Sequence, residues 1–269
     1  EGKLADLDFA DDIALLSDTH DGIQKMMKDL GEHGEKVGLR ISCEKTKAMI
    51  IGESQFPAIT INQHDIEYVE KFLYLGSYIS RIGDAEVDVT AIRIGKAASV
   101  FQRLRPIWKA GAISKAVKLR LYTSIVLPTA IYAGETWTRT EKISKKLDVF
   151  HHRCLRTIMG ISWKDHVSNE ELMKRSGMEE LRDIVEKRRR RFAGHVMRLQ
   201  TERPARVAME WTPKNGKRRR GRPRKTWRST FREDLKAMQV SWSEAHEAAS
   251  DRDRWRQLVA QCSVRSGRI

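Results

Sequence analysis

Hydrophobic positions follow one pattern over the first 80 residues and another over the rest of the chain. Up to Arg81 they form short runs typical of β-strands, at residues 7–9, 13–16, 39–42, 48–51, 59–61, 66–68 and 74–79. A helix with Asp18 or Thr19 as its N-cap interrupts them, from about residue 21 to residue 36. Residues 62–65 join two of the later runs as a hairpin.

The pattern beyond Arg81 predicts helices. We expect them at about residues 85–108, 115–127, 178–199, 227–238, 241–249 and 252–261. Ser114 caps the second of these, and Pro128 breaks or kinks it. The two patterns together predict an α+β fold class, in which short antiparallel strands and a helix are followed by a mainly α-helical region.

Two adjacent carboxylates, Asp11 and Asp12, separate the first two apolar runs. The order of run, acids and run predicts a β-hairpin with both carboxylates at its tip. Asp-Asp is common turn chemistry, and on these residues alone that interpretation is favoured. The alternative is a cation site, because a hard divalent ion such as Mg²⁺ takes oxygen ligands of this kind.

Three segments change that balance because they occur in a recognisable order. They are Phe9-Ala10-Asp11-Asp12, Gly38-Leu39-Arg40-Ile41-Ser42-Cys43-Glu44-Lys45-Thr46-Lys47 and Phe72-Leu73-Tyr74-Leu75-Gly76-Ser77-Tyr78-Ile79-Ser80. Together they resemble the active-site hairpin and the next two palm segments of reverse transcriptases from non-LTR (LINE-type) retrotransposons, the endonuclease-reverse transcriptases. The resemblance continues through residues 130–137 and 151–163 and covers essentially the whole chain.

This resemblance implies a domain order. Residues 1–84 would be the C-terminal part of a truncated polymerase palm and residues 85–138 thumb-like helices. A helical basic region at 139–212, a basic Gly/Pro linker at 213–226 and a C-terminal helical segment at 227–269 would follow. The family also needs fingers and an aspartate from an earlier palm strand, which would precede Glu1. The implied function is therefore part of an RNA-directed DNA polymerase, and we expect this chain alone not to polymerise.

The resemblance also assigns roles to single residues. Asp11 and Asp12 would be catalytic carboxylates and ligands of Mg²⁺, with Asp11 the stronger candidate, once the missing aspartate is present. Lys45 would lie near the phosphates of the incoming nucleotide; the alternative is a solvated lysine in a turn. The segment 74–79 would grip the primer end.

Charge divides the chain in the same place as the hydrophobic pattern. Residues 1–90 contain 9 Lys and Arg against 18 Asp and Glu, whereas residues 91–269 contain 42 against 18. Residues 187–228 alone hold 17 cations and two acids. This split predicts an acidic face joined to a basic region that binds RNA and DNA. The candidate contacts are Lys187, Arg188, Arg189, Arg190, Arg191, Arg218, Arg219, Arg220, Arg222, Arg224 and Lys225.

Residues 213–226 are too rich in Gly, Pro and cations to build a core, so we expect an arm that is extended or disordered. Its segment Arg220-Gly221-Arg222-Pro223 resembles an AT-hook, which binds the DNA minor groove. A nuclear localisation signal or plain phosphate attraction is the favoured alternative, and the segment also resembles an element of the retrotransposon family. We expect a nuclear or cytoplasmic location, or both.

Other sequence features narrow the functional class. No apolar run approaches the roughly 18 residues that span a membrane, so no membrane partner is expected. Cys43, Cys154 and Cys262 lack zinc-finger spacing, and we expect no zinc; for His151, His152 and Cys154, packing between helices is favoured over metal binding.

The alternative function is a non-catalytic nucleic-acid-binding remnant or domesticated protein. A helical scaffold for protein partners, whose binding would survive high salt, ranks last.

Overall fold

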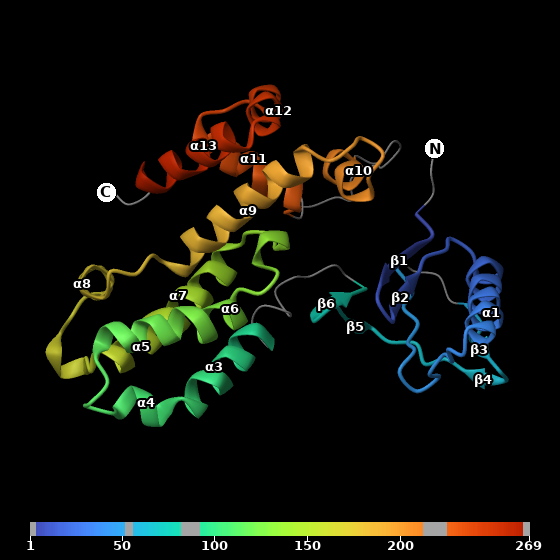
Figure 1. Cartoon of the computed structure of the whole chain (residues 1–269), viewed down its shortest axis with the longest axis horizontal. Helices are drawn as coiled ribbons and strands as arrows, with labels where there is room; N and C mark the ends of the chain where they lie inside the picture. Colours follow the sequence, from blue (N-terminus) through green and yellow to red (C-terminus); the bar gives the residue numbers. More distant parts are fainter. Residues whose placement is uncertain (1–3, 52–55, 82–91, 212–224, 266–269) are drawn as a thin grey trace. The chain divides into compact units, whose positions relative to one another are not determined.

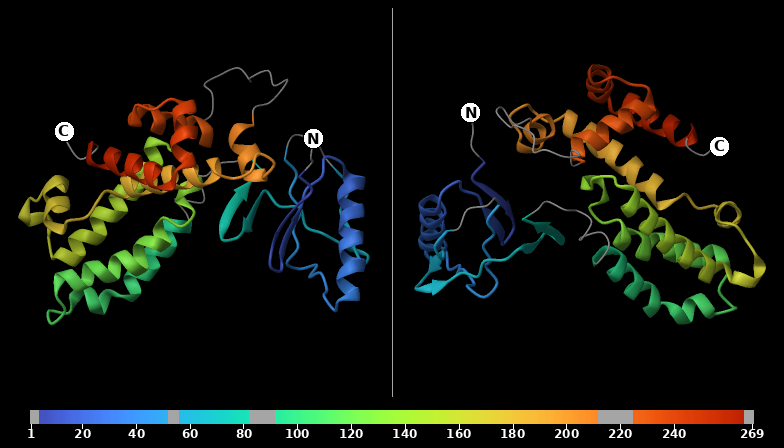
Figure 2. Two further views of the ribbon diagram at one scale, coloured as in Figure 1. Left: turned by 45° about the horizontal axis from the view of Figure 1, so that its top comes forward. Right: turned by 180° about the vertical axis from the view of Figure 1, so that it is seen from behind.

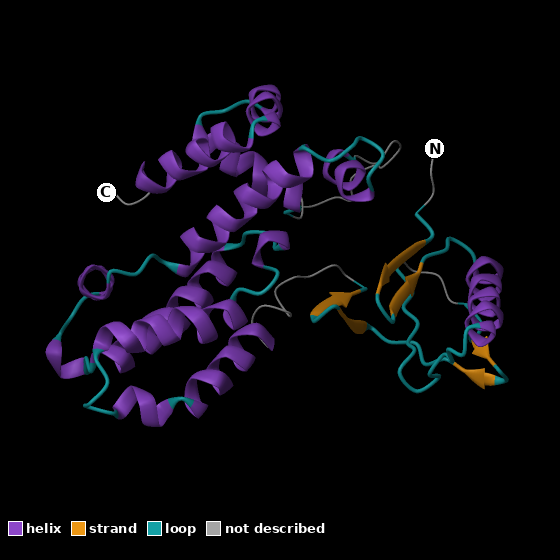
Figure 3. Cartoon of the chain, in the orientation of Figure 1, coloured by secondary structure: helices purple, strands orange, loops and turns teal. Residues whose placement is uncertain are grey.

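The computed structural model describes residues 4–51, 56–81, 92–211 and 225–265, with side chains placed up to residue 262. The chain divides into two compact units, Glu1–Asp88 and Val89–Ile269. Among the described residues, every β-strand belongs to the first unit, and the second is built from helices (Figure 3). The last described strand ends at Ser80, close to Arg81, where the sequence pattern changes from strands to helices.

The described residues of the first unit form one helix and three antiparallel hairpins (Figure 1). The hairpins are β1 (Asp6–Phe9) with β2 (Asp12–Leu15), β3 (Thr60–Ile61) with β4 (His64–Asp65), and β5 (Lys71–Tyr74) with β6 (Ser77–Ser80). The helix α1 (His20–Lys36) begins at Thr19, whose side chain accepts a hydrogen bond from the Gly22 amide. The predicted N-cap is therefore confirmed.

Each of the three hairpins turns through at least one residue with positive φ, and in two of them both turn residues have it. Asn62 and Gln63 (φ 47° and 64°) join β3 to β4, which confirms that a hairpin forms there. Its second strand is His64–Asp65, so the strand predicted at residues 66–68 is wrong. Leu75 and Gly76 (φ 47° and 78°) join β5 to β6, so the single strand predicted over residues 74–79 is wrong. Leucine rarely adopts this conformation, which is why the turn escaped the sequence pattern.

The strands predicted at residues 39–42 and 48–51 are also wrong. Residues 39–42 are irregular, and in the second segment Ala48 forms one isolated parallel bridge to Tyr68. Ile41 and Ala48 of these segments still pack against the small core around the buried Ile59, Ile61 and Ile66. Gln24 fixes α1 to this core, because its amide group both donates to and accepts from the Thr60 backbone, at 2.8 and 2.9 Å.

The first core of the helical unit is formed by α3–α8 and the first half of α9. The helices are α3 (Ile94–Arg103), α4 (Arg105–Lys109), α5 (Lys115–Leu121), α6 (Leu127–Ala130), α7 (Glu141–Met159), α8 (Asn169–Ser176) and α9 (Leu181–Met197), with short 3₁₀ turns at Gly134–Thr136 (η3) and Trp163–Asp165 (η4). Buried side chains of this core include Phe101, Trp108, Tyr122, Leu147 and Leu155.

Two prolines shape the helices of this core. The helix predicted over residues 85–108 ends at Leu104, just before Pro106, and resumes as α4; residues 85–91 lie outside the described structure. Ser114 caps α5 as predicted, accepting from the Val117 amide. Pro128 does not end the helix, because the π-helical segment Tyr122–Val126 (η2) carries it from α5 into α6.

A second core forms where α10 (Pro204–Glu210), α11 (Trp227–Met238), α12 (Trp242–Ser250) and α13 (Arg252–Arg265) pack on the second half of α9 (Figure 2). Val185 of α9 belongs to the first core, and Ala193 and Val196 belong to the second. The helices predicted at 178–199, 227–238, 241–249 and 252–261 thus correspond to α9, α11, α12 and α13. None of the described helices is long and apolar enough to cross a membrane.

Candidate nucleic-acid interface

The two carboxylates of the predicted catalytic pair lie at the turn between β1 and β2. Ala10, with a φ of 55°, and Asp11 form the turn, and Asp12 begins β2 opposite Phe9. Both aspartates are exposed. The sequence therefore located this hairpin and its tip correctly, and the carboxylates face solvent.

The segment expected to hold the primer end lies against this hairpin. The Tyr74 hydroxyl of β5 donates a hydrogen bond to the Leu7 carbonyl of β1, at 3.0 Å. Leu7 and Tyr74 are 67 residues apart in the chain. The third of the segments that resemble a polymerase palm is thus in contact with the hairpin that carries the first.

We tested whether the residues around Asp11 and Asp12 fit a two-metal site. No group of three His, Cys, Asp or Glu residues within the described ranges could hold a metal ion. Asp11 and Asp12 can supply oxygen ligands, but no third carboxylate of the described structure joins them. These residues do not by themselves complete a site for two Mg²⁺ ions, and no reaction step is derived through such ions.

Lys45, the candidate nucleotide-binding residue, lies in a turn that the Thr46 amide closes by donating to the Ser42 carbonyl. Its side chain is exposed and forms no ion pair with any described acid. Lys47, by contrast, binds Glu67 at 2.6 Å. Of the two lysines in this segment, Lys45 is therefore the one whose charge is available to a ligand.

The structure corrects the predicted role of two residues in the basic run of α9. Arg189 and Arg190 are buried, with 1% and 4% of their surface exposed. Arg189 forms a bidentate ion pair with Asp234 of α11, and Arg190 binds Glu186 at 3.1 Å. Five consecutive helical residues point in all directions, so two of these five face the protein interior. Their charges are neutralised there and do not reach a nucleic acid.

The other three residues of the run are placed differently from one another. Lys187 binds Glu179 at 3.0 Å, and Arg188 donates to the Ile131 carbonyl. Arg191 is exposed. Arg191 is thus the residue of this run that is best placed to contact a phosphate.

The predicted basic arm is mostly outside the described residues, and this includes Arg218, Arg219, Arg220, Arg222 and Arg224. Lys225 is described: it is exposed and binds Glu233 at 2.9 Å.

Sequence analysis missed a row of cations on α11. Arg228, Arg232 and Lys236 are spaced four residues apart and therefore share one face of the helix, about 6 Å from one to the next. The guanidinium groups of Arg228 and Arg232 lie 5.2 and 5.9 Å from the centre of the Trp242 ring. The four-residue spacing of these cations could have predicted a shared helix face. It was overlooked because the preceding arm, at residues 213–226, has a higher density of cations.

His151 of α7 has a packing role, as predicted, whereas His152 pairs with Glu180 at 2.9 Å. His151 is fully buried: the Tyr122 hydroxyl lies 2.7 Å from its Nδ1, and the Glu179 carbonyl lies 3.1 Å from its Nε2. Because a carbonyl only accepts, Nε2 carries the proton and Nδ1 accepts from the hydroxyl. Burial lowers the pKa of His151 to about 4 and raises the pKa of the nearby Cys154 thiol to about 12.

Comparison with known proteins gives one informative relative. The chain is 26% identical to F52C9.6 of Caenorhabditis elegans, whose name describes it as transposon-derived and uncharacterized, and the alignment covers 98% of each chain. No family model and no solved structure matches. The similarity supports a transposon-related origin for this chain.

Proposed function

We propose that the chain derives from the reverse transcriptase of a non-LTR retrotransposon and that it acts by binding RNA and DNA. The contact between Tyr74 and Leu7 carries the proposal, because it joins two segments that a polymerase palm needs side by side. The exposed carboxylates at the tip of the same hairpin and the transposon-derived relative support it.

The helical unit supplies the charge for binding. Its sequence holds a large excess of cations, and the described part exposes Arg191, Lys225, Arg232 and Lys236. Phosphate contacts by such side chains give affinity that depends little on base sequence and falls steeply with salt.

The polymerase chemistry belongs to a longer assembly in this proposal. Asp11 and Asp12 would contribute two of the carboxylates of a two-metal site, and an aspartate of another palm strand would complete it. The exposed apolar side chains of the hairpin, Phe9 and Ile13 at 64% and 42%, are what a sheet that lacks its neighbouring strands would show.

One observation favours a second function, that of a non-catalytic nucleic-acid-binding protein. The described residues offer no third ligand beside Asp11 and Asp12, whereas the basic helical unit needs no partner to bind a polyanion. Mg²⁺-dependent primer extension by a protein that adds a third palm aspartate to this chain would separate the two functions, because it would appear in the first case and not in the second.

Two assays test the proposal on this chain. Fluorescence anisotropy with labelled RNA, DNA and RNA–DNA duplex measures the association constant. The logarithm of this constant should fall linearly with the logarithm of the salt concentration. Primer extension with dNTPs and Mg²⁺ should give no product. Binding that is unchanged in high salt would contradict the proposed phosphate contacts, and primer extension would contradict the incomplete site.

A further inference from the structure

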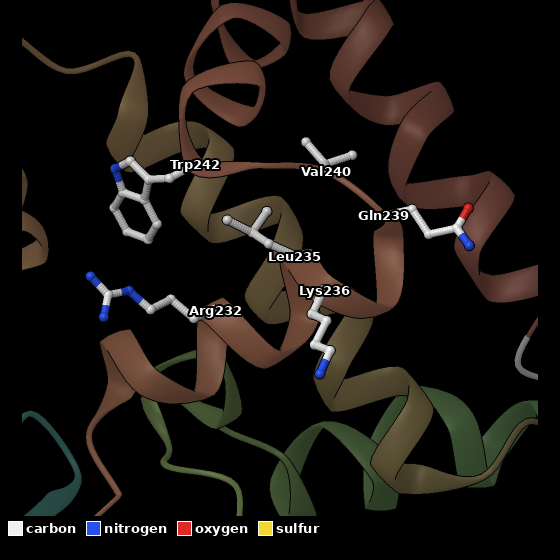
Figure 4. Close-up of a pocket in the computed structure, with 6 residues that line it drawn as sticks. All are labelled: Arg232, Leu235, Lys236, Gln239, Val240 and Trp242. Atoms are coloured by element: carbon white, nitrogen blue, oxygen red, sulfur yellow. The ribbon is translucent and has the colours of Figure 1, made fainter.

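A hollow of about 340 Å³ lies between α11 and the beginning of α12 (Figure 4). Arg232, Leu235, Lys236, Gln239, Val240 and Trp242 line it. Trp242 and Arg232 lie on one side, Gln239 lies on the opposite side, and the buried Leu235 lies between them (Figure 4). The hollow thus combines an aromatic wall and an apolar floor with two cationic side chains.

The charge around this hollow is positive. Arg232 and Lys236 are exposed, and neither forms an ion pair with a described acid. The acids of the two helices have partners elsewhere: Glu233 binds Lys225, Asp234 binds Arg189, Glu244 accepts from the Ser241 amide, and Glu247 binds Arg254. An occupant of this hollow should therefore carry negative charge.

The aromatic wall is held in place by its neighbours. Phe231 and His246 meet the Trp242 ring edge-on, at centroid distances of 5.7 and 5.9 Å. A fixed indole beside cations that form no ion pair with a described acid is the combination that recognises a base and its phosphate, because every base has a π-face and every nucleotide has a charge.

We propose that this hollow binds one nucleotide of a single-stranded nucleic acid. The base lies beside Trp242 and Leu235, and the phosphate lies at Arg232 and Lys236. A duplex does not enter, because its bases are stacked and paired. This inference rests on the proposed nucleic-acid binding and adds a preference for single strands at a defined place.

The test uses the full chain and the double variant Arg232→Gln/Lys236→Gln. Both side chains are exposed, so their loss leaves the fold intact. The control, Lys145→Gln/Lys174→Gln, removes the same charge from exposed positions on α7 and α8. Affinity is measured for a single strand of about 12 nucleotides and for the corresponding duplex, within the range of site sizes seen for single-strand binders.

We expect the double variant to bind the single strand roughly tenfold more weakly, as the loss of a stacked base and its phosphate contacts would cause. Duplex affinity should change by less than about threefold, as expected for two lost surface charges. The control should change both affinities by this smaller amount. Equal losses for strand and duplex would overturn the nucleotide site, since a general charge effect would explain them.

A second measurement locates the contact directly. A single strand containing a photoreactive thymidine analogue is cross-linked to the wild-type chain and the modified peptide identified. Cross-links within residues 232–242 are expected, and cross-links confined to other segments would overturn the inference. If the wild-type chain binds strands but the double variant binds them equally well, the nucleotide site in the hollow is overturned. If the wild-type chain binds no nucleic acid, the proposed function itself fails.

Discussion

The carboxylate of Asp234 accepts two hydrogen bonds from the guanidinium of Arg189, at 2.6 Å from Nε and 3.0 Å from Nη2. The side chains are 0% and 1% exposed, so the pair is buried completely. It connects α11 to α9, the helix whose two halves belong to different cores. Arg190 lies 3.9 Å from the same carboxylate and binds Glu186.

Substituting Asp234→Asn should destabilise the helical unit strongly. The Arg189 guanidinium would stay buried without its counter-charge, which costs about 3–5 kcal/mol of unfolding free energy. Glu233→Gln, at the neighbouring exposed position, should cost less than about 0.5 kcal/mol. Urea denaturation followed by circular dichroism measures both. Equal stabilities of the two variants would show that Asp234 is solvated.

Removing both charges together should recover most of that loss. Arg189→Met/Asp234→Leu replaces the ion pair by apolar side chains, an exchange that is often neutral or stabilising in buried sites. The double variant should therefore be more stable than Asp234→Asn by at least about 2 kcal/mol. If the loss persists in the double variant, packing rather than unpaired charge causes it.

Two glycine substitutions should have opposite effects. A Cβ atom at Gly194 of α9 would collide with the indole of Trp255, whose Nε1 donates to the Arg190 carbonyl. Gly194→Ala should therefore lose about 1–3 kcal/mol or more through overpacking. Gly95 of α3 has open space at the same atom, and Gly95→Ala should gain up to about 1 kcal/mol from helix propensity. Thermal unfolding of both variants checks the signs, and destabilisation by Gly95→Ala would contradict the geometry.

Half-buried Asp148 and buried His151, both of α7, should have opposite effects on stability as pH changes. Burial, with Glu180 nearby, raises the pKa of Asp148 from 3.8 to about 6, although Arg182 acts in the other direction. The folded chain then holds a proton that the unfolded chain has released, so this group makes stability fall as pH rises from about 4 to 6. Burial, with His152 nearby, lowers the pKa of His151 from 6.5 to about 4. This second group makes stability rise as pH rises from about 4 to 6.5.

Substituting Asp148→Asn should therefore expose the effect of His151. The variant lacks the Asp148 carboxyl, whose contribution to stability falls as pH rises. Its free energy of unfolding should therefore increase between pH 4 and 6.5 more steeply than that of the wild-type chain. Denaturant midpoints measured across this range decide the matter. Parallel curves for variant and wild type would mean that Asp148 titrates normally in the folded chain.

Local chemistry made parts of the fold predictable from the sequence. Thr19 and Ser114 cap helices because each hydroxyl precedes the first turn and accepts a hydrogen bond from a backbone amide that has no partner within the helix. The turn at Leu75 was missed, because a leucine with positive φ contradicts local preference and is imposed by the pairing of β5 with β6. Pairing across long separations was equally hidden, since nothing near Arg189 shows that Asp234, 45 residues later, neutralises it.

The candidate site divides in the same way. The sequence located Asp11 and Asp12 at a turn because turn and strand signals are local. Arg232 and Lys236 became candidate binding residues only in the structure, where the Trp242 ring lies beside Arg232. The run of cations does not predict that Arg189 and Arg190 are buried, because the helical period shows only which residues share a face of the helix. Which face then meets the core depends on partners from distant segments.

The carboxylates at the β1–β2 turn lead to the last prediction. Two exposed aspartates bind Mg²⁺ weakly unless further ligands fix the ion, and no third ligand lies with them among the described residues. Millimolar Mg²⁺ should therefore leave the unfolding temperature of this chain unchanged, because a ligand stabilises a protein only when its concentration exceeds its dissociation constant. Asp11→Asn/Asp12→Asn should behave like the wild-type chain in the same titration, and Ca²⁺ is a control for general charge screening. A stabilisation by Mg²⁺ that the double variant abolishes would mean that the site is complete in this chain, and primer extension would then have to be expected of it.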